Sequence, residues 1–469
     1  MKSVPWTHGN CYGNDCEPRY IAISYTWGRW KLKPGQLPNV DALPVDGVTW
    51  EIPRVDPVHF SVAEFKNVLE SAAKLFYDYE ALNNPGKPPS TINYIWLDVA
   101  CVNQTRGSAE MAAEIGRQAK IFKGATMAFV WLTKLSRQGF LAQMKKDEED
   151  GKASRSRATN SLERKQSSWD MATAQVEHLS LDPWFSSLWT LQEAYLCPHA
   201  IFITREGEFL TRSDDATAAE DPFLLEDFID FCDQHLRMVV YEEQSPESTV
   251  SNDGRLLKLR QALELSGMAG IRWQLPITLL GAAHHRKTRR PEDRVYGIMQ
   301  VFGFRLGKSR PGCDPKRDFT LPELEDELGK ELLEREPIMS QMHVFAKRPQ
   351  VGKGWRIAQD SQPTRRLRLV NETYGEGKSA IEDMLPQAQL STTTLGGATW
   401  GQSSGKICTF SKLVDAWDSA SGWGDGIVDL DGMENWTAIH GPDWGFRMID
   451  ETQQIHTSPD SLRWDEPYY

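Results

Sequence analysis

The sequence lacks a long apolar run and has few cysteines. No apolar stretch in the 469 residues approaches the roughly 20 residues that a membrane helix needs. The opening residues, MKSVPWTHGNCYGNDC, also lack the apolar core of a signal peptide. We therefore expect a cytoplasmic protein with no membrane partner. The 7 cysteines, an odd number, fit reduced thiols better than a disulfide framework, and no second ligand pair at zinc-finger spacing follows Cys11 and Cys16, so no metal site is expected.

Positive charge is also in deficit. Lys plus Arg total 53 against 65 Asp plus Glu, which gives a net charge of −12. Because binding to a nucleic-acid polymer or an anionic membrane depends on a basic surface, this balance argues against both partners. It leaves room for a small anionic ligand held by a few local groups. The length and composition are those of a globular protein with more than one domain.

Apolar, β-branched runs alternate with amphipathic helices in the first part of the chain. Strands are predicted at 20–25, 93–98, 126–132 and 200–204, and helices after the capping box at 61–64, at 109–123 and at 182–196. Near-continuous apolar strands separated by helices predict an α/β domain whose parallel sheet is covered on both faces.

Two other parts of the chain have a different character. Residues 145–168 are charged and poor in large apolar groups, which predicts a mobile insertion outside the core. Beyond about residue 307 the chain is rich in Gly, Pro, Ser and Trp and has no clear periodicity. The predicted organisation is an α/β domain at 15–205, a helical extension at 206–306 and an irregular, partly β accessory region at 307–469.

Polar side chains follow the first two predicted strands. In open parallel sheets, ligands bind outside the carboxyl ends of the strands. These ends carry Ser24, Tyr25, Trp27 and Gly28 after the first strand, and Asp98, Cys101, Asn103 and Gln104 after the second. Asp98 is either a cap for the loop that follows or a group that contacts a ligand. Cys101 has no histidine nearby, which favours a buried, inert thiol.

The helix predicted at 182–196 places one carboxylate, Glu193, among aromatic and aliphatic side chains. Asp182 is a suitable N-cap and Pro183 suits the first helical position. Trp189 lies one turn before Glu193 on the same face. From these residues alone, Glu193 is either a carboxylate that reaches solvent at the edge of a buried helix or a functional group in a crevice.

Five blocks of sequence occur in order between about residues 20 and 303. They are YIAISYTWG, IWLDVACVNQ, IFKGATMAFVWL, PWFSSLWTLQEAYL and PEDRVYGIMQVFG. In order and approximate spacing they resemble the fungal heterokaryon-incompatibility (HET) domain. The chain departs from that pattern at Val102, where isoleucine is usual, at Glu114, where glutamine is usual, and at 290–293, which read Arg-Pro-Glu-Asp in place of Asp-Pro-Arg-Asp.

HET domains in turn look like Toll/interleukin-1 receptor (TIR) domains, many of which hydrolyse NAD in cell-death pathways. Residues 23–25 are similar to the Ile-Ser-Tyr strand of that family, and Trp189 and Glu193 keep the spacing of its Trp-Cys-x-x-Glu helix, with Thr190 in place of cysteine. The resemblance implies a TIR-like (flavodoxin-like) fold, a role in non-self recognition and programmed cell death, self-association, and NAD as a substrate that needs no further cofactor. It implies that Glu193 is catalytic. Together with the strand-end positions, it predicts an NAD site formed by Ser24, Tyr25, Trp27, Gly28, Arg29, Asp98, Asn103, Gln104 and Trp189.

This assignment is chemically reasonable. Breaking the nicotinamide–ribose bond builds positive charge on the ribose, which an ionised Glu193 could stabilise. Trp189 could stack on the base, and the loop 28–31 could donate hydrogen bonds to the pyrophosphate. Two alternatives remain open: a death-signalling assembly module without catalysis, and a hydrolase of another nucleotide or nucleoside. Measuring nicotinamide release, and then turnover of a panel of nucleotides, separates the three.

Overall fold

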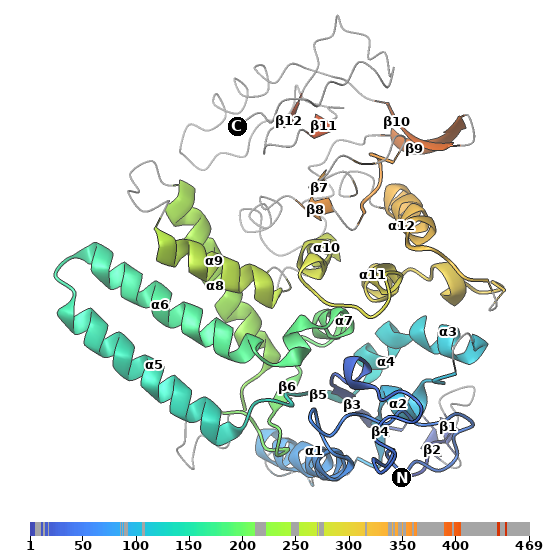
Figure 1. Cartoon of the computed structure of the whole chain (residues 1–469), viewed down its shortest axis with the longest axis horizontal. Coiled ribbons are helices and arrows are strands. Elements are labelled where there is room, and N and C mark those ends of the chain that lie inside the picture. The colour runs from blue at the N-terminus through green and yellow to red at the C-terminus, as the bar shows by residue number, and fades with distance from the viewer. Residues whose placement is uncertain are drawn as a thin grey trace, which may run out of the picture. The chain divides into compact units, whose positions relative to one another are not determined.

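The computed structural model of the whole chain is shown in Figure 1. It describes residues 1–363 apart from gaps, and beyond residue 363 it describes four strands only. The gaps lie at 5–10, 13–14, 17, 85, 87, 89–91, 106–107, 212–221, 245–252, 270, 272–275, 315–316, 336–339, 341–342, 346–348, 350–352 and 359–360. The chain divides into two compact units, Met1–Phe319 and Thr320–Tyr469.

A four-stranded parallel sheet forms the centre of the first unit. Its strands are β3 (Tyr20–Ser24), β4 (Tyr94–Trp96), β5 (Met127–Trp131) and β6 (Ile201–Ile203), and they lie in the order β4-β3-β5-β6. Counted along the chain this order is 2-1-3-4, as in a flavodoxin-like sheet, so the strand order reverses between β3 and β5. The predicted α/β fold class is confirmed.

Alternation along the strands divides their side chains between two covered faces. Helix α1 (Val62–Asn83) covers one face and begins with the predicted capping box, in which Ser61 and Glu64 bond each other's backbone N–H. The core on this side contains Phe65, Val68, Leu69, Ala72 and Phe76 of α1 and Ile21, Ile23, Phe129, Trp131, Ile201 and Ile203 of the sheet.

The opposite face of the sheet lies against α4 (Gln118–Gly124), the 3-10 turn η3 (Pro183–Ser186) and α7 (Leu188–Leu196). The rings of Trp96 and Phe122 meet edge to face at 5.2 Å, and those of Trp184 and Phe202 at 6.3 Å. The helix predicted at 109–123 is split into α3 (Ala109–Ile115) and α4, with Gly116 at the break.

The helix predicted at 182–196 is also interrupted. Asp182 accepts a hydrogen bond from the backbone N–H of Trp184, but the turn that it caps is η3, and α7 begins only at Leu188. Ser187 between them has extended backbone, with φ −90° and ψ 140°. The hydroxyl of Thr190 donates to the carbonyl of Trp184 and so holds the corner in place. Because Ser187 is extended, α7 does not continue the axis of η3.

The segment 145–168, which the sequence predicts to be a mobile insertion outside the core, lies in two long helices. These are α5 (Arg137–Arg157) and α6 (Ser161–Ser180), which pack side by side as a hairpin (Figure 1). Ser136 and Asn160 cap them. Many charges remain compatible with a helix because only one stripe of each helix is covered.

The rest of the first unit is mainly helical. It contains α8 (Leu225–Gln244), α9 (Gly254–Ser266), α10 (Pro276–His284), α11 (Asp293–Tyr296), η5 (Met299–Phe302) and η6 (Gly307–Ser309). Near the start of the chain are β1 (Cys11–Tyr12), β2 (Asp15–Cys16), η2 (Gly28–Trp30) and α2 (Asp98–Cys101).

The second unit contains one described helix and three antiparallel strand pairs, which agrees with the expected partly β region. The helix is α12 (Leu321–Arg335), and the pairs are β7 (His343–Phe345) with β8 (Ser361–Pro363), β9 (Gln389–Leu395) with β10 (Ala398–Ser404), and β11 (Ile439–His440) with β12 (Phe446–Arg447). In the described part of the chain, no helix combines the length and the hydrophobicity that a membrane span requires.

Candidate functional site

Ser24, the last residue of β3, contacts the carboxylate of Glu193 on α7. Its hydroxyl donates a hydrogen bond to Glu193 Oε2 and accepts one from the indole N–H of Trp184 at 2.7 Å. Glu193 as a residue keeps partial exposure, whereas its carboxylate is surrounded by protein. Burial therefore raises the pKa of Glu193 to about 8, Ser24 opposes the rise, and the nearby charge of Asp98 adds to it.

Asp98, at the start of α2, is the second enclosed carboxylate. It accepts hydrogen bonds from the indole N–H of Trp27 and, at 2.7 Å, from the backbone N–H of Val99. Burial raises the pKa of Asp98, while these donors favour its ionised form. Glu193 accepts a hydrogen bond from Ser24, so fewer donors favour its ionised form than favour that of Asp98.

Tyr25 belongs to the core beneath this pair. Its ring is 6% exposed and packs against Phe60, Phe65 and Trp131. The hydroxyl interacts electrostatically with Asp98 but makes no well-directed hydrogen bond. Tyr25 therefore supports Asp98 from the α1 side of the sheet, whereas Ser24, one residue earlier, faces α7.

Asn103 and Gln104 make bonds within their own loop. Asn103 Oδ1 accepts from the backbone N–H of Thr105 at 2.8 Å, and its amide N–H lies 3.4 Å from Glu110. Gln104 donates to the carbonyl of Asp98 at 3.1 Å and to that of Val102 at 2.8 Å. In the structure both residues shape the turn that follows Asp98.

The loop after β3 is tied to the corner before α7. The guanidinium of Arg29 donates to the carbonyl of Pro183 at 2.9 Å and to the hydroxyl of Ser186 at 2.8 Å. It also lies 5.0 Å from the centre of the Trp30 ring. Gly28 opens η2, and a Cβ there would meet nothing within 4 Å, so no steric constraint explains the glycine.

Trp189 lies on α7 one turn before Glu193 and connects the helix to α11. Burial raises the pKa of Asp293, and the nearby indole of Trp189 opposes that rise. Trp189 therefore lies close to the carboxylate of Asp293, at the start of α11. Of the predicted residues, the structure thus joins Ser24 to Glu193 and Trp27 to Asp98, while Trp189 lies near Asp293 of the helical extension.

Sequence reasoning missed three buried residues at this site. One is Trp184, which lies in the quoted aromatic stretch but received no role. Another is His59, which is 0% exposed, stacks on Trp30 at 3.7 Å and approaches the carbonyl of Thr26 at 2.5 Å. Burial lowers the pKa of His59 to about 4, so it is neutral and braces the loop after β3. Neither residue had a spacing pattern that could have identified it.

The third missed residue is Arg286, which is 1% exposed. Its guanidinium donates to the carbonyls of Trp184 at 3.2 Å, Ser187 at 3.4 Å and Ser266 at 2.6 Å. Burial lowers its pKa to about 9. Arg286 lies in the basic run HHRKTRR, which has the composition of a solvated loop, so its burial could not be predicted from the sequence.

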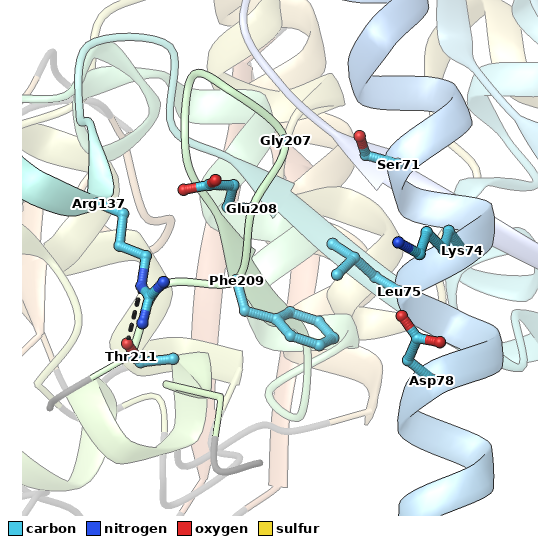
Figure 2. Close-up of a pocket in the computed structure, with 9 residues that line it drawn as sticks. All are labelled: Ser71, Lys74, Leu75, Asp78, Arg137, Gly207, Glu208, Phe209 and Thr211. Carbon is cyan, nitrogen blue, oxygen red and sulfur yellow. Dashed lines mark hydrogen bonds between the residues drawn. The ribbon is translucent and has the colours of Figure 1, made fainter. Parts of the chain in front are cut away.

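A separate cavity of about 280 Å³ lies between α1 and the turn after β6 (Figure 2). It is lined by Ser71, Lys74, Leu75, Asp78, Arg137, Gly207, Glu208, Phe209 and Thr211. Charges of both signs are mixed around it, and Arg137 donates to Thr211 at 3.3 Å. None of the site residues discussed above lines this cavity.

The strand ends, the paired carboxylates and the corner before α7 all fall in one stretch of sequence that matches a family model. Residues 20–193 match the heterokaryon incompatibility protein (HET) family. We call them the HET segment. Comparisons with curated proteins and with solved structures found no match. The match ends at Glu193, so it includes both carboxylates and excludes Arg286 and Asp293.

Proposed function

We propose that the protein acts in heterokaryon incompatibility, in the cytoplasm of fungal cells, and that its HET segment is a TIR-like enzyme that hydrolyses NAD to nicotinamide and ADP-ribose. Self-association is proposed to switch this activity on. The observation that carries the proposal is the pair of enclosed carboxylates, Glu193 on Ser24 and Asp98 on Trp27, at the carboxyl ends of β3 and β4. That edge is where flavodoxin-like sheets bind their ligands.

Cleavage of NAD requires charge stabilisation more than proton donation. The nicotinamide ring is already cationic and leaves as a neutral molecule, taking the electron pair of the bond to ribose C1′. Water then adds to C1′ and one proton is released. Positive charge develops on the ribose in between, and a carboxylate held in a poorly solvated site stabilises it strongly. We assign this role to Glu193, with Asp98 as the second negative group.

Because the pKa of Glu193 is raised, substrate binding must favour the ionised form of this side chain. With a pKa of about 8, Glu193 is mainly protonated at pH 7 in the free protein. A cationic nicotinamide riboside beside it favours the ionised form, because opposite charges lower a carboxyl pKa. NAD binding should therefore release a proton near neutral pH.

The same pKa supports a second candidate, the hydrolysis of a nucleoside or nucleotide whose base is uncharged. Here the leaving base must receive a proton, and a protonated carboxylic acid near neutral pH is a suitable donor. Glu193 would be that acid and Asp98 the charged partner. The two candidates use the same residues but require opposite protonation states of Glu193.

The test is nicotinamide release from NAD by the purified protein and by Glu193→Gln. The substitution keeps the size of the side chain and removes its charge, so turnover should fall by about 100-fold or more. Glu149→Gln on α5 is the matched control, because it is an exposed carboxylate outside the site. Turnover only of nucleosides or nucleotides with an uncharged base would favour the second candidate, and no turnover of any nucleotide would leave an assembly role without catalysis.

A further inference from the structure

Three positive side chains from two distant parts of the sequence gather beside the candidate site. Lys31 follows η2, while Arg289 and Arg290 lie in the turn between α10 and α11. The pKa of Lys31 is lowered by its partial burial and then by the charges of Arg289 and Arg290, with Glu51 opposing. Among the described residues, no carboxylate forms a salt bridge with any of these three cations.

Backbone hydrogen bonds fix the turn that carries the two arginines against the start of α7. The N–H of Lys287 donates to the carbonyl of Ser186 at 2.7 Å, and the N–H of Leu188 donates to the carbonyl of Lys287 at 3.2 Å. The position of the turn is therefore set by the same corner that orients Glu193. Arg289 and Arg290 themselves are exposed and free to meet a ligand.

The two segments that carry these three cations also contain residues close to Glu193 and to Asp98. Arg290 acts electrostatically on Asp293, and Asp293 lies near the indole of Trp189, which is one turn before Glu193. On the other side, Trp27, next to η2, donates to Asp98. The cations therefore lie on the loop after β3 and on the turn before α11, next to the residues proposed to act on the substrate.

The three cations repel one another, and Glu51 and Asp293 are the opposite charges that act on Lys31 and on Arg290. Like charges within electrostatic range of one another are unfavourable. A ligand with two or more adjacent negative charges relieves the repulsion. Guanidinium groups recognise phosphate oxygens through paired, charge-assisted hydrogen bonds.

We propose that Lys31, Arg289 and Arg290 form a phosphate subsite, which holds the pyrophosphate of a nucleotide whose ribose lies at Glu193. The identity of the reacting end rests on the function proposed above, whereas the subsite itself does not. It makes the helical extension, which lies outside the HET segment, a direct contributor to substrate recognition. The substrate class is then a nucleotide with two linked phosphates rather than a nucleoside.

Binding of ADP-ribose and of adenosine, measured by isothermal titration calorimetry at low salt, tests the subsite without requiring turnover. Arg289→Ala/Arg290→Ala should weaken ADP-ribose binding by about tenfold or more, the effect of losing charge-assisted hydrogen bonds, and should leave adenosine binding unchanged. Arg289→Lys/Arg290→Lys should retain part of the affinity. Lys145→Ala/Lys146→Ala is the matched control, since it removes an adjacent pair of exposed cations from α5.

Equal ADP-ribose affinity in the wild type and the double alanine variant overturns the subsite, and so does a wild type that binds no ADP-ribose. Nicotinamide release on the same proteins keeps the two proposals apart. Arginine-dependent binding without release would support the subsite and contradict NAD hydrolysis. If the wild type and Arg289→Ala/Arg290→Ala release nicotinamide with the same kcat/KM for NAD, hydrolysis is supported and the subsite is overturned.

Discussion

The ionisation of Glu193 should control how NAD turnover depends on pH. Its pKa of about 8 in the free protein means that about 9% is ionised at pH 7 and about 1% at pH 6. Because kcat/KM follows the essential groups of the free enzyme, it should rise about tenfold from pH 6 to pH 7 and level off above pH 8. Nicotinamide release, measured at constant ionic strength from pH 6 to 9, gives this profile.

Hydrolysis of a nucleotide with an uncharged base should give the opposite dependence of kcat/KM on pH. Protonated Glu193 is then the active form, so kcat/KM should be constant at low pH and decline above about 8. A kcat/KM for NAD that is constant between pH 6 and 8 would refute the assignment of Glu193 as the charged group. Loss of the rise in Glu193→Gln, but not in Glu149→Gln, ties the profile to this carboxylate.

The same pKa predicts that the stability of the fold decreases as pH rises, whereas kcat/KM for NAD increases. The folded-state pKa is raised from 4.5 to about 8, so the folded protein binds the proton more tightly and loses stability as pH rises through this window. The whole shift corresponds to an upper limit of about 5 kcal/mol. Glu193→Gln never ionises, so urea unfolding should show it to be more stable than the wild type at pH 9 and nearly equal at pH 4.5. A less stable variant at pH 9 would contradict the burial of this charge.

Three further predictions concern Ser24, His59 and the α5–α6 hairpin. Ser24→Ala removes a hydrogen bond that lowers the pKa of Glu193, so the midpoint of the kcat/KM profile should move above about 8; an unchanged midpoint would show that Ser24 does not tune it. His59 has a folded pKa of about 4 against 6.5 when unfolded, so stability should fall by about 3 kcal/mol as pH drops from 6.5 to 4, and His59→Phe should lose less on urea unfolding. Replacing 145–168 with a Gly/Ser linker should lower Tm by several degrees, because it removes the start of α6, where Lys165 bonds Glu242 at 2.5 Å; an unaltered Tm would mean that this hairpin adds no stability.

The sheet could be predicted from the sequence because its strands are short apolar runs with clear boundaries. Alternation could also have separated Ser24 from Tyr25, since neighbouring strand residues face opposite sides. The helices that contain residues 145–168 could not be predicted from composition. Their composition is that of a solvated segment, and the helix is stabilised by caps and by one packed stripe that tertiary contacts supply.

The site was predictable only where chemistry follows a strand end or a helical spacing. Ser24, Asp98 and Glu193 have such positions, and the structure brings the first and last into contact. The corner at Ser187 could not be foreseen, because helix propensity continues through it and the break depends on bonds to residues far along the chain. The burial of Arg286 depends on the same long-range contacts.

The buried guanidinium of Arg286 sets a limit on how this protein can be divided. A chain cut soon after α7 would keep every residue of the HET segment, yet the carbonyls of Trp184 and Ser187 would lose their donor and Leu188 its backbone acceptor. Gene fusion or shuffling that moved residues 20–193 alone would therefore transfer the carboxylates without the clamp that aims them. The smallest portable unit should reach past Lys287, and exchange between relatives should preserve both pieces together.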